Sequence, residues 1–349
     1  HNLAVRRIAT GFGFLNREAG LPIAESLVPY TPASTYSRAL LVGVLNTLKV
    51  AAVGIILATV LGTLVGIARL SRNWLLSRIA ATYIEAIRDV PLLLQLLFWY
   101  TLLQTLPAPR QAANPVAGVF LSNRGLKLPW VQWQDAHSFA LLGFVCGIVA
   151  TVLYARSARA RQMQDGQPRR VWPVALGLIA GLPLVIWAGM GAPWQGDLPA
   201  LRGFNFVGGL NISPEYFALL AGLVTYTAAF IAEIVRAGIQ SVHKGQMEAG
   251  ASLGLTRGST LRLIVVPQAL RVILPPLTNQ YLNLTKNSSL AVAIGYPDLF
   301  SVFAGTTLSQ TGQAIEIIAI TMGVYLLISL ITSAIMSFYG WRIGRSMGA

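Results

Sequence analysis

The chain has 349 residues, of which 54% are hydrophobic and only 11% are charged, and its formal net charge at pH 7 is +14. A soluble globular domain carries about a quarter charged residues, so this composition excludes a water-soluble protein and indicates an integral membrane protein. The basic excess does not indicate a nucleic-acid partner, because most Lys and Arg residues stand in short loops beside apolar runs.

The residue patterns that bind metals or nucleotide phosphates are missing from the sequence. Cys146 is the single cysteine and the three histidines are scattered, so we expect neither a disulfide framework nor a metal site. No lysine follows a glycine, which excludes the phosphate-cradling Gly-Lys-Ser/Thr loop. We therefore expect that the chain does not hydrolyse ATP itself and holds no cofactor of its own.

Seven segments are apolar enough to cross a bilayer, which requires roughly 20 mostly apolar residues. They are residues 40–69, 79–106, 138–155, 172–190, 214–241, 268–295 and 313–340. The fourth segment contains Pro173 and Pro183, which are expected to kink it. The sequence therefore predicts an all-α integral membrane protein.

Basic residues mark every second connection along these segments. They are Arg69, Arg72, Arg78, Arg156, Arg159, Arg161, Arg169, Arg170, Lys244, Arg257, Arg262, Arg342 and Arg345. If the segments alternate, all of these residues lie on one side, which the positive-inside rule identifies as the cytoplasm. Residues 1–37, 107–137 and 191–213 are then external. Because residues 1–37 include no apolar targeting run, we expect a membrane segment or cleaved signal upstream of His1.

The most distinctive run is Glu248-Ala249-Gly250-Ala251-Ser252-Leu253-Gly254, with Ile264 and Pro267 beyond it. Residues 244–253 can form under three turns of helix, and Gly254 tolerates the positive φ that ends one. Thr256 can cap a second helix, and Pro267 stands where the chain re-enters the membrane. The same pattern is compatible with an ordinary helix–glycine–helix turn.

The run resembles the EAA loop of the membrane subunits of bacterial ABC importers, a short cytoplasmic helix that docks on the ATPase subunit. Four further runs are similar, in the right order, to motifs of the polar amino-acid permeases (the HisM/GlnP-like family). They are Asn46-Thr47-Leu48, the Arg88-x-x-Pro91-Leu92 pattern within 83–95, Ala232-Glu233-Ile234-Val235-Arg236-Ala237-Gly238, and Leu284-Thr285-Lys286-Asn287-Ser288-Ser289-Leu290. The resemblance implies that segments one, two, five, six and seven form the five-helix core of a type I ABC importer permease.

This resemblance also implies the partners of the chain. Within a coupling loop at 244–266, Glu248, Ala249, Gly250, Gly254 and Arg257 would contact the ATPase subunits, which would bind ATP and Mg²⁺. A second permease subunit, forming a heterodimer, and an extracytoplasmic amino-acid-binding protein would complete the complex. The implied location is the bacterial inner membrane, crossed several times.

Residues 107–213 depart from the minimal family, which joins its second and third core helices by a short connection. An inserted helix pair with two external loops, including Leu121-Ser122-Asn123-Arg124-Gly125-Leu126, resembles the larger general L-amino-acid permeases of the AapQ/BztB type. The predicted division is an external segment at 1–37, two core helices at 38–106, the insertion at 107–213, and three core helices with the coupling loop at 214–349.

Ionisable residues inside a span cost about 2.5–3.5 kcal/mol each on insertion scales, so each needs a partner or a purpose. Glu233 and Arg236 lie within the fifth segment. They form either an i, i+3 ion pair within the helix, or a substrate site in which Glu233 receives an α-amino group.

A second polar group lies in the sixth segment. Lys286, Asn287, Ser288 and Ser289 can line a cavity that receives a substrate carboxylate, or they can form a polar seam between helices. Asn46, in the first segment, is a further candidate substrate ligand, whereas neighbouring Lys49 has no assigned role.

Two other functions compete with the ABC importer subunit. One is a secondary transporter driven by an ion gradient, although the inverted repeats of such proteins are not visible in this sequence. The other is a membrane module without transport activity, such as a sensor or an assembly factor. Copurification of a soluble ATPase would separate the ABC importer from both.

Overall fold

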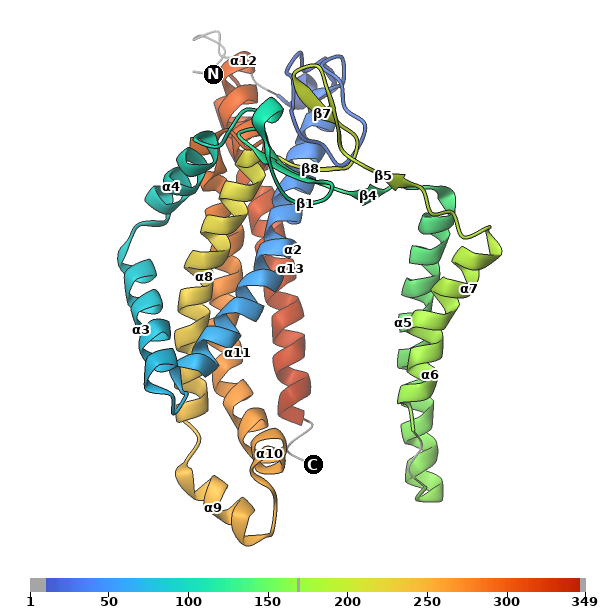
Figure 1. Cartoon of the computed structure of the whole chain (residues 1–349), viewed down its shortest axis with the longest axis vertical. Coiled ribbons are helices and arrows are strands. Elements are labelled where there is room, and N and C mark those ends of the chain that lie inside the picture. The colour runs from blue at the N-terminus through green and yellow to red at the C-terminus, as the bar shows by residue number, and fades with distance from the viewer. Residues whose placement is uncertain (1–10, 168–169, 346–349) are drawn as a thin grey trace. The chain divides into compact units, whose positions relative to one another are not determined.

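The computed structural model describes residues 11–167 and 170–345 (Figure 1). The chain forms two compact units. One combines the described residues up to Leu106 with those from Ser213 onward, and the other is Pro107–Ile212. Arg169 of the basic loop and the first ten residues of the predicted external segment lie outside the described residues.

The first unit is a bundle of helices. Its elements are the 3₁₀-helix η1 (Phe12–Asn16), α2 (Tyr36–Arg69), α3 (Trp74–Asp89), α4 (Leu92–Gln104), α8 (Pro214–Gln240), α9 (Lys244–Ser252), α10 (Arg257–Thr260), the π-helix η4 (Leu261–Val265), α11 (Val266–Asn287), the 3₁₀-helix η5 (Ser288–Ile294), the π-helix η6 (Phe300–Thr307), α12 (Leu308–Thr311) and α13 (Ala314–Arg345). The link between α2 and α3, helix α9 and the end of α13 all lie at one end of this bundle, as alternating spans require (Figure 1).

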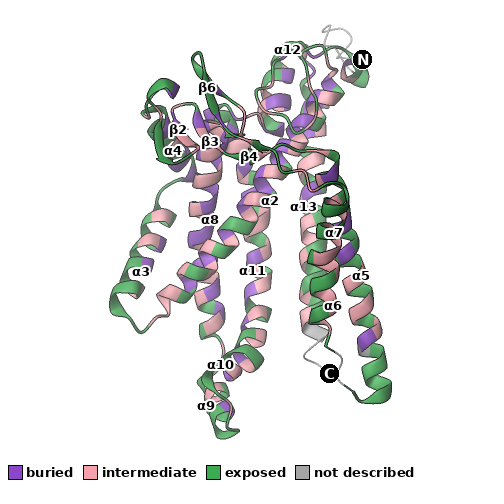
Figure 2. Cartoon of the chain, turned by 45° about the vertical axis from the view of Figure 1, so that its right-hand side comes forward, coloured by how far each residue is buried: buried purple, intermediate pink, exposed green. Residues whose placement is uncertain are grey.

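Glycines allow α2 and α8 to pack closely in this unit. A Cβ atom added at Gly62 would lie 2.7 Å from the Cβ of Ile231, and one at Gly66 would lie 2.7 Å from the carbonyl oxygen of Ala232. Glycines four residues apart permit such close approach in membranes. Helix α8 is central in this unit. In its most apolar stretch of 18 residues 61% is buried, against 17% in that of α13, and Figure 2 shows buried residues along α8.

The span predicted at 79–106 is not one continuous helix. Helices α3 and α4 are separated by two residues and their axes differ by 104°. Pro91 has no N–H group and restricts Val90 to an extended backbone (φ −96°, ψ 128°), which ends α3. The Gln95 side chain then donates to the carbonyl oxygens of Ile87 (2.9 Å) and Val90 (3.0 Å). Among the described residues, six helices are therefore long and apolar enough to cross a membrane, or seven spans if the bent pair is one span.

The described part of the N-terminal segment packs onto one end of the first unit. Phe14 and Leu21 are buried in a cluster with Tyr36, Leu299 and other apolar residues. The rings of Phe14 and Tyr36 meet edge to face with centroids 5.9 Å apart. This segment is thus part of the core and not a loose tail.

The second unit contains a helix pair and short strands. Its elements are the 3₁₀-helix η2 (Pro109–Gln111), β1 (Ala113–Val116), β2 (Val119–Ser122), β3 (Gly125–Leu128), β4 (Trp130–Val131), α5 (Asp135–Asp165), α6 (Trp172–Leu176), the π-helix η3 (Gly177–Gly181), α7 (Leu182–Gly189), β5 (Gly196–Asp197), β6 (Ala200–Arg202), β7 (Asn205–Val207) and β8 (Leu210–Ile212). The helices pack through Gly143 and Gly147, whose added Cβ atoms would lie 2.5 Å from Ile186 Cδ1 and 2.1 Å from the Leu178 carbonyl oxygen.

This unit differs from the sequence expectation in two respects. The predicted segment 138–155 is the middle of α5, which continues to Asp165 because a boundary in hydropathy is not a boundary in helix propensity. The external loops also contain strands, paired in the antiparallel order β1-β2-β3-β8 with the separate pairs β4-β5 and β6-β7. Gly118 (φ +82°) sits in the β1-β2 turn, so this hairpin depends on a glycine conformation.

Candidate functional site

The predicted coupling loop is a helix–turn–helix at the end of the first unit that also holds the α2–α3 link (Figure 1). Helix α9 begins after His243, whose Nδ1 accepts from the Gly245 amide at 3.1 Å. It ends before Gly254, which has φ +74° as expected. Thr256 caps α10 by accepting from the Ser259 amide at 3.2 Å. The local structure predicted for residues 244–256 is therefore confirmed.

Gly250 holds the two halves of this loop together. It is buried, and a Cβ atom added there would lie 2.6 Å from Cγ2 and 2.7 Å from Oγ1 of Thr260. Thr260 is itself buried and its hydroxyl donates to the Thr256 carbonyl at 3.1 Å. The amide of Leu255 also donates to the Gly250 carbonyl at 3.0 Å. The absence of a side chain at position 250 is thus what lets α9 lie against α10.

The other candidate coupling residues are exposed. They are Glu248, Ala249, Gly254 and Arg257, and 78% of the surface of neighbouring Leu253 is accessible. An exposed Leu at the end of a charged helix is suited to an apolar groove on another protein. The arrangement offers a surface for a partner and not an internal site.

Glu233 and Arg236 form an ion pair within α8. The Arg236 Nε donates to one Glu233 carboxylate oxygen at 3.0 Å and its Nη2 donates to the other. Arg236 also contacts the Gln240 side chain. The structure thus contains the intrahelical pair of the first interpretation, and the carboxylate is already occupied by two charge-assisted donors. The substrate role of these residues stays a prediction.

The polar group of the sixth segment lies where α11 gives way to the 3₁₀-helix η5. Lys286 and Ser289 line a cavity of about 360 Å³, together with Thr321, Tyr325 and apolar side chains such as Phe300 and Met322. Ser288 is buried and donates to the Thr285 carbonyl at 2.7 Å, and neither it nor Asn287 lines the cavity. The structure therefore separates the four candidates into two that line the cavity and two that do not.

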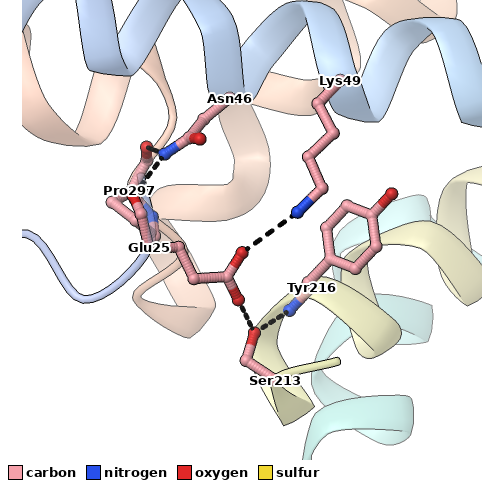
Figure 3. Close-up of polar contacts among 6 residues, drawn as sticks. All are labelled: Glu25, Asn46, Lys49, Ser213, Tyr216 and Pro297. Atoms are coloured by element: carbon pink, nitrogen blue, oxygen red, sulfur yellow. Dashed lines mark hydrogen bonds and ion pairs between the residues drawn. The ribbon is translucent and has the colours of Figure 1, made fainter. Parts of the chain in front are cut away.

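The side chain of Asn46 forms hydrogen bonds to the backbone of two other segments of the chain. Its side chain is buried and its Nδ2 donates to the carbonyl oxygens of Glu25 and Pro297, both at 2.9 Å (Figure 3). It therefore joins α2 to the N-terminal segment and to the link after η5. Both amide hydrogens are used by these bonds, which leaves no donor on Asn46 for a substrate.

Sequence reasoning missed the partner of Lys49. The Lys49 Nζ lies 3.4 Å from the Glu25 Oε2 and 4.1 Å from the ring centre of Tyr216 (Figure 3). Glu25 is 24 residues away and stands in a segment without periodicity or motif, so no local pattern indicates it. The signal that could have led to it was the charge of Lys49 inside an apolar span, which requires a counterion.

A family model described as a binding-protein-dependent transport system inner membrane component matches residues 173–344. The putative amino-acid ABC transporter permease protein YhdX of Escherichia coli (strain K12) is 54% identical over 98% of this chain and 87% of its own length. The general L-amino acid transport system permease protein AapQ of Rhizobium johnstonii is 50% identical over 98% of this chain and 86% of its own length. The glutamate/glutamine/aspartate/asparagine transport system permease protein BztB of Rhodobacter capsulatus is 41% identical over 98% of this chain and 87% of its own length.

A solved structure, described as an amino acid ABC transporter with histidines, matches 88% of this chain and 95% of its own with a TM-score of 0.51. Its sequence identity is 23%, so it supports the fold alone. The predicted all-α membrane fold of the type I importer class is confirmed by this match, by the helical content and by the six candidate spans. The chain therefore belongs to the amino-acid ABC transporter permeases, within the family of binding-protein-dependent transport system inner membrane components.

Proposed function

We propose that this inner-membrane permease subunit imports polar L-amino acids. Two relatives that match nearly its whole length carry names for general L-amino acid transport and for transport of glutamate, glutamine, aspartate and asparagine. An extracytoplasmic binding protein delivers the substrate, and ATP with Mg²⁺ is bound by partner ATPases. The family assignment leaves the secondary-transporter alternative without support.

The exposed helix α9 is the observation that carries the coupling mechanism. It packs against α10 at Gly250 and exposes Glu248 and Ala249, while Leu253 and Arg257 are exposed in the turn after α9 and at the start of α10. α10 continues through η4 into α11, so a force on α9 reaches a membrane-spanning helix through continuous helical backbone. Closure of the ATPases would thereby rock α11 against its neighbours and change which side of the membrane is accessible.

The cavity beside Lys286 is the best-supported substrate position in the first unit. Its mostly apolar walls strengthen the attraction between the Lys286 ammonium and a substrate carboxylate, and the Ser289 hydroxyl is close enough to line the same space. Glu233 is the weaker candidate, because its two oxygens are engaged by Arg236. A second permease subunit of different sequence would complete the pathway.

Copurification and uptake test the proposal. A tagged chain, isolated from its native membrane, should bring with it a soluble ATPase and a second permease chain, and the reconstituted complex should take up radiolabelled L-glutamine in an ATP-dependent way. Isolation of the chain without an ATPase, or uptake driven by an ion gradient alone, would refute it.

Two sets of variants then address the sites. Glu248→Lys should abolish uptake with normal membrane insertion, while Glu248→Gln separates loss of charge from its reversal. Lys286→Met should block uptake but leave basal ATP hydrolysis intact, whereas Glu233→Gln should retain more uptake. Full transport by Glu248→Lys would refute the coupling role of this residue, and full transport by Lys286→Met would show that the substrate site lies elsewhere.

A further inference from the structure

A charged cluster in the first unit, apart from the cavity beside Lys286, joins three distant parts of the chain. Glu25 of the N-terminal segment pairs with Lys49 of α2, and its other carboxylate oxygen accepts from the hydroxyl of Ser213 (Figure 3). The side chains of Lys49 and Glu25 keep 30% and 18% of their surface accessible. The pair is therefore desolvated in part but is still within reach of a molecule in solution.

The ion pair is one of several contacts that attach the N-terminal segment. Phe14 and Leu21 anchor that segment in the apolar cluster, and Asn46 binds the backbone carbonyl of Glu25. Replacement of a partly buried ion pair by apolar side chains is often neutral for stability. A purely structural role therefore does not by itself account for a carboxylate and an ammonium group at this position.

The groups around the Glu25 carboxylate form a binding site for carboxylates. They are an ammonium group, a hydroxyl donor and the start of α8, a helix of 27 residues whose N-terminal dipole favours an anion. Ser213 is the cap of that helix and accepts from the Tyr216 amide at 3.1 Å while donating to Glu25. The Tyr216 ring lies beneath Lys49 and holds its ammonium in place by a cation–π contact.

A second observation concerns Tyr296, which lies next to this cluster. Tyr296 is fully buried, and among the described residues its hydroxyl has no hydrogen-bond partner. Its ring packs against that of Tyr216 with centroids 5.7 Å apart. A buried hydroxyl without a partner is unusual in a folded protein and points to a missing ligand group or water.

We propose that Lys49, Ser213 and the N-terminus of α8 bind the α-carboxylate of an incoming amino acid, and that Glu25 is an internal occupant which the substrate displaces. The exchange replaces one carboxylate by another, so no unpaired charge is left at Lys49. Water can solvate the released Glu25 side chain, because it is already partly exposed. This inference rests on the proposed import of amino acids and adds an entry site to it.

Binding of radiolabelled L-glutamine to the purified complex, without the binding protein, tests the proposal. Glutamine carries a single carboxylate, so the probe reports on the α-carboxylate alone. Glu25→Gln removes the internal competitor and should tighten binding about tenfold, a difference of about 1.4 kcal/mol. Lys49→Met should weaken binding at least about tenfold, and Lys49→Arg should retain most of it. The decarboxylated analogue 4-aminobutanamide should not distinguish Glu25→Gln from the unaltered complex.

The double variant Glu25→Lys/Lys49→Glu, which exchanges the two charges, distinguishes a substrate-binding role of the pair from a purely structural one. It restores an ion pair, so the melting temperature should match that of the unaltered protein, but glutamine binding should be lost because the carboxylate now stands on α2. Normal binding by the exchanged variant, or no gain in Glu25→Gln, would overturn the inference. Should the exchanged variant fail to assemble, the binding affinities of Glu25→Gln and Lys49→Met still decide. Failure of the unaltered complex to import any amino acid would instead refute the proposed function.

Discussion

The contact between Gly250 and Thr260 gives the sharpest test of the coupling loop. Gly250→Ala places a methyl carbon 2.6 Å from Thr260 Cγ2 and 2.7 Å from Oγ1, whereas ordinary van der Waals contact begins near 3.4 Å. The helices must therefore separate by about 0.8 Å, or Thr260 must turn. Rotation of Thr260 would break its hydrogen bond to Thr256, so we expect α9 to move.

The size of the effect follows from this displacement. Overpacking of this kind costs about 1–3 kcal/mol, and a loop that is exposed on its other side relieves the strain by shifting as a unit. Misplacement of a functional group by about 1 Å lowers rates by up to about a hundredfold. We therefore expect Gly250→Ala to insert and assemble normally but to lose at least about tenfold in ATP-driven uptake by proteoliposomes.

A matched control lies in the same loop. Gly258 is exposed on α10 with nothing within 4 Å of an added Cβ atom, so Gly258→Ala should transport normally. Thr260→Ala removes the two closest atoms, so that the Thr260 Cβ at 3.2 Å becomes the nearest, and should restore uptake to Gly250→Ala. Full uptake by Gly250→Ala, or no rescue by Thr260→Ala, would contradict the argument from packing.

Three further predictions address topology, packing and pH. In a Cys146→Ser background, a cysteine placed in 155–167 should react with impermeant thiol reagents only after the cell is opened, and one in 120–125 should react in intact spheroplasts. The reverse pattern would show that the predicted membrane topology is inverted. Gly62→Ala brings a methyl group within 2.7 Å of Ile231 and should lower the melting temperature, whereas Gly323→Ala, which meets nothing within 4 Å, should not. Burial raises the pKa of Asp298 from 3.8 to about 6. The protonated carboxyl therefore adds about 3 kcal/mol to the free energy of unfolding below about pH 4, and this contribution is lost as the pH rises through 6. Asp298→Asn should flatten the dependence of stability on pH between pH 4 and 7. An unchanged dependence would show that this carboxyl does not titrate as stated.

The sequence by itself determined the features that depend on local physical chemistry. Apolar runs of sufficient length identified the membrane segments, because the cost of exposing backbone to lipid applies to each segment separately. The bounds of α9, the left-handed Gly254 and the cap at Thr256 were also predicted, since capping and glycine conformation involve residues only a few positions apart. The break at Val90-Pro91 was equally local and could have been predicted from the proline rule.

Only the tertiary structure decided which polar groups meet. Ser213 contacts Glu25 across 188 residues, and Asn46 contacts Pro297 across 251, and neither pair has a pattern in the chain. Lys286 and Ser289 share a cavity while Asn287 and Ser288 do not. Residues three apart lie on one face of a helix, but the cavity exists there only because side chains of η6 and α13 complete its wall. Gly250 likewise stood out in the sequence only as part of a motif, and its contact with Thr260 is what explains why a side chain cannot stand there. These contacts depend on how separate helices pack, which local preferences of the chain do not specify.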